Sequence, residues 1–155
     1  MANATQGGVT TEMAKLSELA GRHLGFTPWL QMTQDEVDRF ADLTGDHNFI
    51  HVDPERAAQT PFRGTIAHGF FTLSRVAAGA QRITVTDAAM SVNYGLDKVR
   101  FPAPLPVGAR WRGGAELAGV TEIAGGLQAK VTGTIEVKDA ERPACVAECL
   151  VRFYA

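Results

Sequence analysis

One apolar helical segment followed by four long strand-like segments constrains the fold of this chain most. The helical segment spans residues 70–83 (FFTLSRVAAGAQRI) and is apolar around most of its circumference, which is typical of a helix inside a protein. Turns rich in proline and glycine separate the strand-like segments, which span residues 91–102, 109–124, 126–139 and 143–155. This order predicts an α+β fold in which an antiparallel sheet wraps around the helix.

The length and composition of the chain indicate one globular domain. Its 155 residues, 45% of them hydrophobic, are enough to form one core. We expect a flexible N-terminus over residues 1–9 and a single domain over 10–155. Within that domain, apolar residues at helical spacing predict a helical extension over residues 10–27.

Charge and hydropathy exclude several classes of partner. The formal net charge is −2, so the chain lacks the broad basic field that binds nucleic acid. No apolar run approaches the roughly 20 residues that a membrane span needs, and the N-terminus lacks the basic and apolar blocks of a signal peptide. We therefore expect a cytoplasmic protein with neither a nucleic-acid nor a membrane partner. Cys145 and Cys149 fit neither a redox pair nor a zinc framework, and their spacing in a strand favours core packing.

Two helix signals enclose a short polar segment. Thr33 and Glu36 have the spacing of a capping box, and the helix that they open is expected to end at Gly45. Pro54 stands at the first position of the next helical turn. We expect residues 46–52 between these signals to be irregular.

The enclosed segment, TGDHNFIH at residues 44–51, contains an acid and an imidazole. Asp46 and His51 could hold one water molecule between them as a general-base site, and Asn48 could fix the loop by hydrogen bonds. Ordinary turn chemistry and a structural histidine are the alternative interpretation. His47 and His51 also have the spacing of metal ligands on a helix, but Gly45 and the following proline favour a loop, so we predict no metal.

A second candidate lies in GTIAHGFF at residues 64–71. Gly69 stands just before the apolar helix, where backbone N–H groups and the helix dipole stabilise a developing anion. Gly69 is therefore a candidate oxyanion donor, the alternative being that it only shapes a turn.

Together these segments resemble a known family. GDHNFIHVDPERAAQTPFRGTIAHGFF resembles the hydratase 2 motif of the MaoC-like, (R)-specific enoyl-CoA hydratases, and the similarity continues through VNYGLDKVRFPAPLPVGAR, covering about residues 30–153. The resemblance implies a hot-dog fold, with a curved antiparallel sheet wrapped around a long central helix. It also implies that Asp46 and His51 are catalytic, that Asn48 supports them, and that Gly69 donates to the oxyanion.

The activity implied by the resemblance is a hydro-lyase reaction, the reversible syn hydration of trans-2-enoyl-CoA to (3R)-3-hydroxyacyl-CoA. No cofactor is expected beyond the CoA of the substrate, and a homodimer or higher homo-oligomer is implied. The motif departs from the family at Phe49, where a proline is usual, and at Ala77, where some members have a serine, with Ser74 one turn earlier. Acyl-CoA thioesterase and a non-catalytic acyl-binding module remain alternative functions.

Contacts with the substrate are expected from two groups of residues. Phe49 and Ile66 would lie near the acyl chain, although Ile66 is equally explained as core. Arg63, Lys98 and Arg100 could meet the CoA phosphates, the alternative being an ordinary charged outer face.

Overall fold

A curved sheet forms the body of the protein. The computed structural model describes residues 8–80 and 82–155. The sheet has six strands, all paired antiparallel, in the order β2, β6, β7, β8, β5, with β3 also paired to β6. Their bounds are β2 His23–Phe26, β3 Leu30–Gln31, β5 Met90–Arg100, β6 Arg110–Ile123, β7 Gly126–Val137 and β8 Cys145–Tyr154. The four strands predicted from the second half of the sequence are therefore confirmed.

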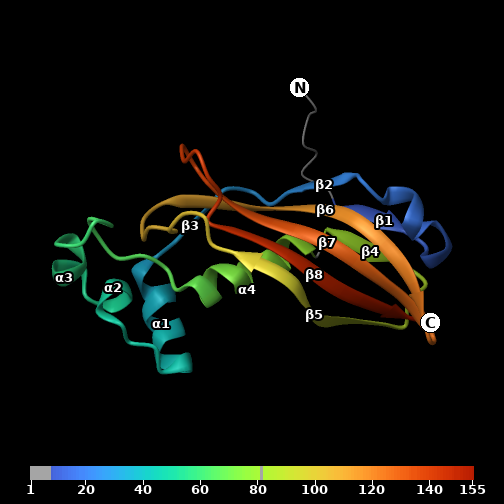
Figure 1. Ribbon diagram of the computed structural model, residues 1–155, viewed down its shortest axis with the longest axis horizontal. Helices are drawn as coiled ribbons and strands as arrows, with labels where there is room; N and C mark the ends of the chain where they lie inside the picture. The colour runs from blue at the N-terminus through green and yellow to red at the C-terminus, as the bar shows by residue number, and fades with distance from the viewer. Residues whose placement is uncertain (1–7, 81) are drawn as a thin grey trace.

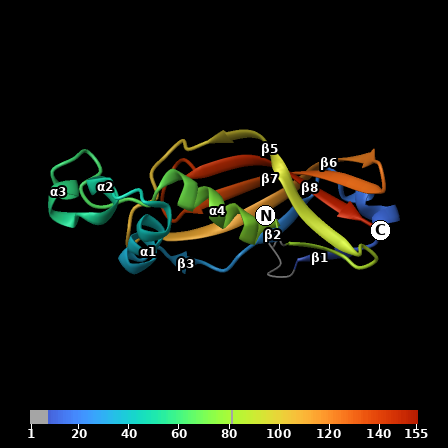
Figure 2. The ribbon, with the colours of Figure 1, turned by 90° about the horizontal axis from the view of Figure 1, so that it is seen from below.

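Helix α4, which spans Gly69–Ala80, lies against one face of this sheet. Figure 1 shows the long strands curving together above the helix, and Figure 2 shows the helix crossing in front of them with β5 at the sheet edge. Phe71 and Val76 of the helix join a buried cluster with Trp111 and Ile135 of the sheet. This is the hot-dog arrangement that the sequence predicts.

Small residues beneath α4 let the helix come close to the sheet. Ala115, Gly133 and Ala147 lie side by side on β6, β7 and β8. A Cβ atom built at Gly133 would lie 2.1 Å from Cγ1 of Val76. The depth at which α4 packs therefore depends on the missing side chain at Gly133.

The helix is covered on one side. Phe71 and Val76 are buried against the sheet, whereas Phe70 is 76% exposed and Ser74 and Ala77 are also exposed. The sequence predicts this helix inside the protein; in the single chain the sheet covers one side of α4 and leaves the other side exposed. The predicted helix is also too long: it ends at Ala80, and β4 (Ile83–Val85) follows.

The N-terminal region differs from the predicted helical extension over residues 10–27. It contains β1 (Val9–Thr11), a 3-10 helix η1 (Met13–Leu19) and β2, and β1 pairs in parallel with β4. Leu16 and Leu19 are buried in a second cluster with Leu117 and Val131, which explains their apolar spacing. The segment thus extends the core. Residues 1–7 of the expected flexible N-terminus lie outside the described residues, whereas Val9 belongs to a strand.

Three helices gather at one end of the sheet (Figure 1): α1 (Gln34–Thr44), α2 (Phe49–Val52) and α3 (Pro54–Ala58). Both hydrogen bonds of the predicted capping box between Thr33 and Glu36 are present, and Gly45 ends α1 in the left-handed region. The expectation of an irregular segment over residues 46–52 is wrong in part. Asn48 accepts a hydrogen bond from the Ile50 N–H and so opens the single turn α2.

The remaining structural predictions concern the cysteines and the membrane. Cys145 is buried in the main cluster and Cys149 packs against it, as the strand spacing predicts. Burial raises the pKa of the Cys145 thiol to about 11, so this thiol stays protonated at neutral pH. None of the described helices has the length and apolar character needed to cross a membrane.

Replacing Gly133 with alanine should destabilise the protein by about 1 to 3 kcal/mol, because the new methyl group meets a β-branched side chain in a packed core. Urea unfolding monitored by circular dichroism measures this change. Gly119→Ala on β6 is the matched control, since a Cβ atom at Gly119 meets nothing within 4 Å. The second change Val76→Ala should recover part of the loss, and equal stabilities of Gly133→Ala and the wild type would contradict this packing.

Candidate active site

The acid and the imidazole come from the segment that joins α1 to α2. Gly45, with φ of 78°, turns the chain at the end of α1, and Asp46 follows. The Asp46 carboxylate accepts a hydrogen bond from the Asn48 N–H at 3.2 Å, and the Asn48 side chain accepts one from the Ile50 N–H at 3.4 Å. These local bonds place His51 on α2, at the same end of the molecule as Asp46.

The His51 ring is oriented by a backbone carbonyl. Its Nδ1 donates to the Ile66 carbonyl at 2.7 Å, while the Ile66 N–H donates to the Ile50 carbonyl at 3.0 Å. Because Nδ1 must carry the hydrogen of this bond, Nε2 of the neutral ring has a free lone pair. His51 is 7% exposed, so this lone pair belongs to an almost buried imidazole.

Burial also favours the neutral form of His51. Burial is the main cause that lowers the pKa of this ring below its usual value, and the neighbouring His68 lowers the pKa further. The Ile66 carbonyl and Asp46 act in the opposite direction without reversing the shift. At neutral pH, His51 is therefore a proton acceptor at Nε2.

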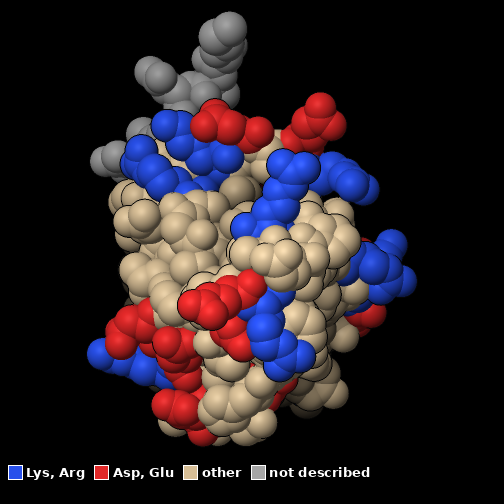
Figure 3. Space-filling view, turned by 90° about the vertical axis from the view of Figure 1, so that its left-hand side faces the viewer, with Lys and Arg blue, Asp and Glu red and all other residues tan. Residues whose placement is uncertain are grey.

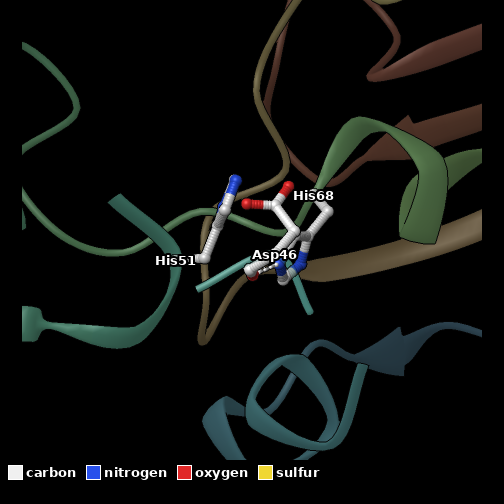
Figure 4. A group of neighbouring side chains, drawn as sticks. All are labelled: Asp46, His51 and His68. Carbon is white, nitrogen blue, oxygen red and sulfur yellow. Dashed lines mark hydrogen bonds between the residues drawn. The ribbon is translucent and has the colours of Figure 1, made fainter. Parts of the chain in front are cut away.

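His68, to which the sequence analysis assigned no role, is the third member of the site. Its Nε2 donates to the Asp46 backbone carbonyl at 2.9 Å, and its ring stacks on the His51 ring with centroids 3.8 Å apart and an interplanar angle of 27°. Potential ligand atoms of Asp46, His51 and His68 all lie within 4.8 Å of one another. Figure 4 shows the Asp46 carboxylate and the tip of the His51 ring on the same side of this cluster.

The stacked geometry does not suit a metal ion. A coordinated ion lies near the plane of each imidazole ring, whereas these rings stack with centroids 3.8 Å apart and 27° between their planes. His51 Nδ1 and His68 Nε2 also already donate to backbone carbonyls. His47, the other histidine considered as a ligand, is instead paired with Asp42 at 2.9 Å on the surface, and this contact raises the pKa of His47. The cluster is better suited to holding a water molecule between Asp46 and His51.

Gly69 lies at the N-terminus of α4, directly after His68. Its N–H finds no backbone acceptor among the described residues, as expected for the first residue of a helix. A Cβ atom at Gly69 would lie 3.3 Å from the Phe101 ring, so the aromatic side chain covers the glycine closely. The amide is at the first position of α4, where the helix dipole favours an anion.

Gln34 on α1 ties the pieces of the site together and was missed by the sequence analysis. Its side-chain amide donates to the His51 carbonyl at 2.7 Å and accepts from the Thr65 hydroxyl at 2.6 Å. It thus connects α1, α2 and the segment before α4. Gln34 lies within the first turn of a predicted helix, and no local sequence signal marks it as different from an exposed polar residue.

The basic residues predicted to contact CoA are on the surface. Arg63, Lys98 and Arg100 are all exposed, and no contact joins any of them to Asp46 or His51 among the described residues. Figure 3 views the end of the molecule formed by α1 to α3, where basic and acidic side chains are mixed with uncharged ones. The structure therefore brings together the predicted Asp46, His51 and Asn48, and it shows no contact between them and the three basic residues within the described ranges.

The residues expected near an acyl chain have different environments. Ile66 is 8% exposed and uses its carbonyl to hold His51, so it belongs to the core. Phe49 is partly buried, and the Arg56 guanidinium lies 4.2 Å from its ring centroid.

An apolar cavity of about 250 Å³ lies between α4 and β5, lined by Leu73, Ser74, Val76, Ala77, Asn93, Tyr94, Gly95, Leu96 and Cys149. A larger one, of about 550 Å³, lies by η1 and the β6–β7 hairpin at the other end of the sheet.

Comparison with known proteins places this chain in a family. The model described as a MaoC like domain matches residues 15–140. The 3-hydroxyacyl-thioester dehydratase Z of Mycobacterium tuberculosis is 51% identical over 145 residues, which cover 92% of this chain and 96% of that relative. Nodulation protein N of Rhizobium leguminosarum bv. viciae is 43% identical over 142 residues, covering 87% and 86% of the two chains.

Solved structures agree on the fold. The R-hydratase from Pseudomonas aeruginosa in its unliganded form matches with a TM-score of 0.73 at 19% identity, over 92% of this chain and 85% of that one. The (R)-hydratase from A. caviae involved in PHA biosynthesis matches with a TM-score of 0.71 at 25% identity, over 85% and 94%. The chain therefore belongs to the MaoC-like dehydratase family, hydro-lyases with the hot-dog fold.

Proposed function

We propose that this protein is an (R)-specific enoyl-CoA hydratase, which adds water reversibly and on one face to trans-2-enoyl-CoA to give (3R)-3-hydroxyacyl-CoA. The observation that carries the proposal is the cluster in which the Asp46 carboxylate lies within 4.8 Å of a ring nitrogen of His51. We also propose that the reaction takes place in the cytoplasm. It requires no cofactor besides the CoA of the substrate.

The proposed reaction uses Asp46 and His51 to hold the attacking water. Nε2 of His51 accepts a proton from the water as the water oxygen bonds to C3, and Asp46 accepts the second hydrogen bond of that water. The electron pair of the C2–C3 double bond moves toward the thioester carbonyl. C2 then takes up, on the same face, the proton that was removed from the water between Asp46 and His51, so that both groups return to their starting protonation states. Dehydration is the same sequence reversed, with the proton returned to the departing hydroxyl.

Gly69 is proposed to stabilise the enolate that forms on the thioester oxygen. The amide is at the positive end of α4, and the helix has 12 residues, so its dipole favours a negative charge there. The Phe101 ring beside Gly69 limits solvation of that charge. One such donor typically contributes about 3 to 4 kcal/mol to the transition state.

The acyl chain is proposed to extend from Gly69 along α4 into the cavity between α4 and β5. The cavity wall contains Leu73, Val76 and Leu96, which suit a short or medium alkyl chain. The CoA and carrier-protein thioesters of the same acyl group have identical reacting atoms, so an assay of both decides between these carriers. Release of free thiol from a saturated acyl-CoA would instead favour the thioesterase alternative.

We also propose that the protein is a homodimer formed through β5. This strand ends the sheet order, and its outer edge has no partner strand among the described residues. Met90, Val92, Tyr94 and Leu96 on it are 40% to 56% exposed. Since the exposed side of α4 lies beside this apolar row, a second copy that pairs edge to edge would cover both.

The roles of Asp46 and His51 are tested by the variants Asp46→Asn and His51→Ala. Each should lower kcat for hydration of crotonyl-CoA by at least about a hundredfold, because each loses one positioned acid or base group. Loss of the enoyl-thioester absorbance measures the rate, and circular dichroism verifies folding. Asp42→Asn is the matched control, since this exposed carboxylate contacts His47 outside the cluster. Wild-type rates in both test variants would remove the proposed site.

The pH dependence follows from the lowered pKa of His51. The reaction needs neutral His51, and a lowered pKa keeps the ring neutral below the ordinary histidine value of about 6.5. We therefore expect kcat/KM to be nearly constant from neutral pH down to about 6.5 and to fall at more acidic pH. An acidic limb of the pH profile centred above that value would contradict this assignment.

The dimer is tested by Leu96→Glu, which places a charge in the apolar row of β5. Sedimentation velocity should show a dimer for the wild type and a monomer for the variant, because burying an unpaired carboxylate opposes association. Leu43→Glu is the control, as Leu43 on α1 is 86% exposed and lies outside β5. A monomeric wild type, or a dimeric Leu96→Glu variant, would contradict the proposed interface.

A further inference from the structure

We propose that His68 is a positioning residue that holds the Asp46 backbone and the His51 ring in register with the Gly69 amide. The inference rests on the proposed hydratase function and assigns a role to a residue that does not itself take part in the reaction steps described above. His68 is 2% exposed and contacts both reacting residues at once.

Asp46 needs such support because its other contacts are local. It lies on an exposed segment after the end of α1, and its nearest hydrogen bonds are to Asn48 and Thr44, two residues away in each direction. The bond from His68 Nε2 to the Asp46 carbonyl spans 22 residues and ties this segment to the start of α4. Without it, the carboxylate would move with a surface turn.

The His51 ring is held from a second direction. The bond to Ile66 fixes one ring nitrogen, but the ring could still rock about that bond. Stacking at 3.8 Å against the flat face of His68 restricts this motion, so that the Nε2 lone pair keeps its direction. The bond and the stack together define the plane of the base.

His68 is itself anchored to the core and to α4. Its ring packs on Phe40 with centroids 5.0 Å apart, and Phe40 in turn stacks on Phe71. Its carbonyl accepts hydrogen bonds from the Thr72 N–H at 2.9 Å and from the Thr72 hydroxyl at 3.1 Å. Because Gly69 follows directly, one rigid residue connects the acid, the base and the oxyanion donor.

The unpaired nitrogen of His68 argues against a role in packing alone. Nδ1 is buried and has no hydrogen-bond partner among the described residues. A buried polar atom without a partner costs stability, and a phenylalanine or leucine would fill the same space without that cost. Phenylalanine would lack the Nε2 donor, and leucine would lack both the donor and the flat ring.

Two variants separate these contributions. His68→Phe keeps a flat ring but loses the donor, and His68→Gln keeps a donor of similar reach but loses the ring. Each should lower kcat for enoyl-thioester hydration by about tenfold to a hundredfold and change KM by less than about twofold, since misplacement affects the reacting groups more than ground-state binding. His23→Gln, a histidine on β2, is the control and should keep the wild-type kcat.

Titration of His51 tests the contact between the two rings, whereas the split between kcat and KM separates positioning from packing. The titratable groups that face His51 are Asp46, from the segment after α1, and His68, from the segment before α4. Removing His68 removes one cause that lowers the pKa of His51, so NMR of the four histidine rings should show His51 titrating at higher pH in both variants. The acidic limb of kcat/KM should move in the same direction.

If the variants do not fold, the tautomers of His51 and His68 in the wild-type protein test the proposal. Nitrogen NMR should find the proton of neutral His68 on Nε2 and that of neutral His51 on Nδ1. A His68 proton on Nδ1 would overturn the proposal, as would folded variants with unchanged kcat and unchanged His51 titration. If the wild type does not hydrate enoyl thioesters, the proposed function fails, while these NMR results still decide how His68 holds the cluster.

Discussion

The hydrogen bond from His51 to the Ile66 carbonyl is the interaction on which the rest of the site depends. At 2.7 Å it assigns the ring hydrogen to Nδ1 and leaves Nε2 free to accept a proton. Burial then keeps the ring neutral by lowering its pKa. Asp46 supplies the second polar group, and His68 lies against both. An acid and a base that are neighbours in a flexible chain would not hold one water molecule. The bond to Ile66 fixes the base, and the bond from His68 to the Asp46 carbonyl fixes the acid.

The fold makes that bond possible by bringing two chain segments to the same end of the sheet. One is the α1–α2 connection, whose geometry is determined by the left-handed Gly45 and by the side chain of Asn48. The other is the segment before α4, which is held because the helix packs deeply over Gly133. Gln34 joins the two segments by hydrogen bonds. The packing of α4 on the sheet thus determines both the stability of the core and the geometry of the site.

Much of this could be predicted from the sequence. The capping box, the proline at the start of α3 and the four long strands are local patterns with strong physical causes, and they were placed correctly. The N-terminal segment was not predicted correctly. Apolar spacing indicates which face of a segment is buried, but it does not distinguish a 3-10 helix from a longer α-helix. The strands β1 and β4 are three residues each and pair across about seventy residues, which no local pattern reveals. The proximity of Asp46 and His51 could be predicted from spacing and resemblance, whereas the contacts of His68 and Gln34 are long-range and become visible only in three dimensions.

The stereochemical course of hydration in heavy water tests the central claim most directly. If Asp46 and His51 hold one water on one face of the substrate, a trans-2-enoyl thioester should give the (3R)-hydroxy product with deuterium at C2 on the face that received the hydroxyl group. Chiral chromatography and proton NMR coupling constants measure both centres in the same product. Deuterium on the opposite face, or a (3S) product, would contradict the account.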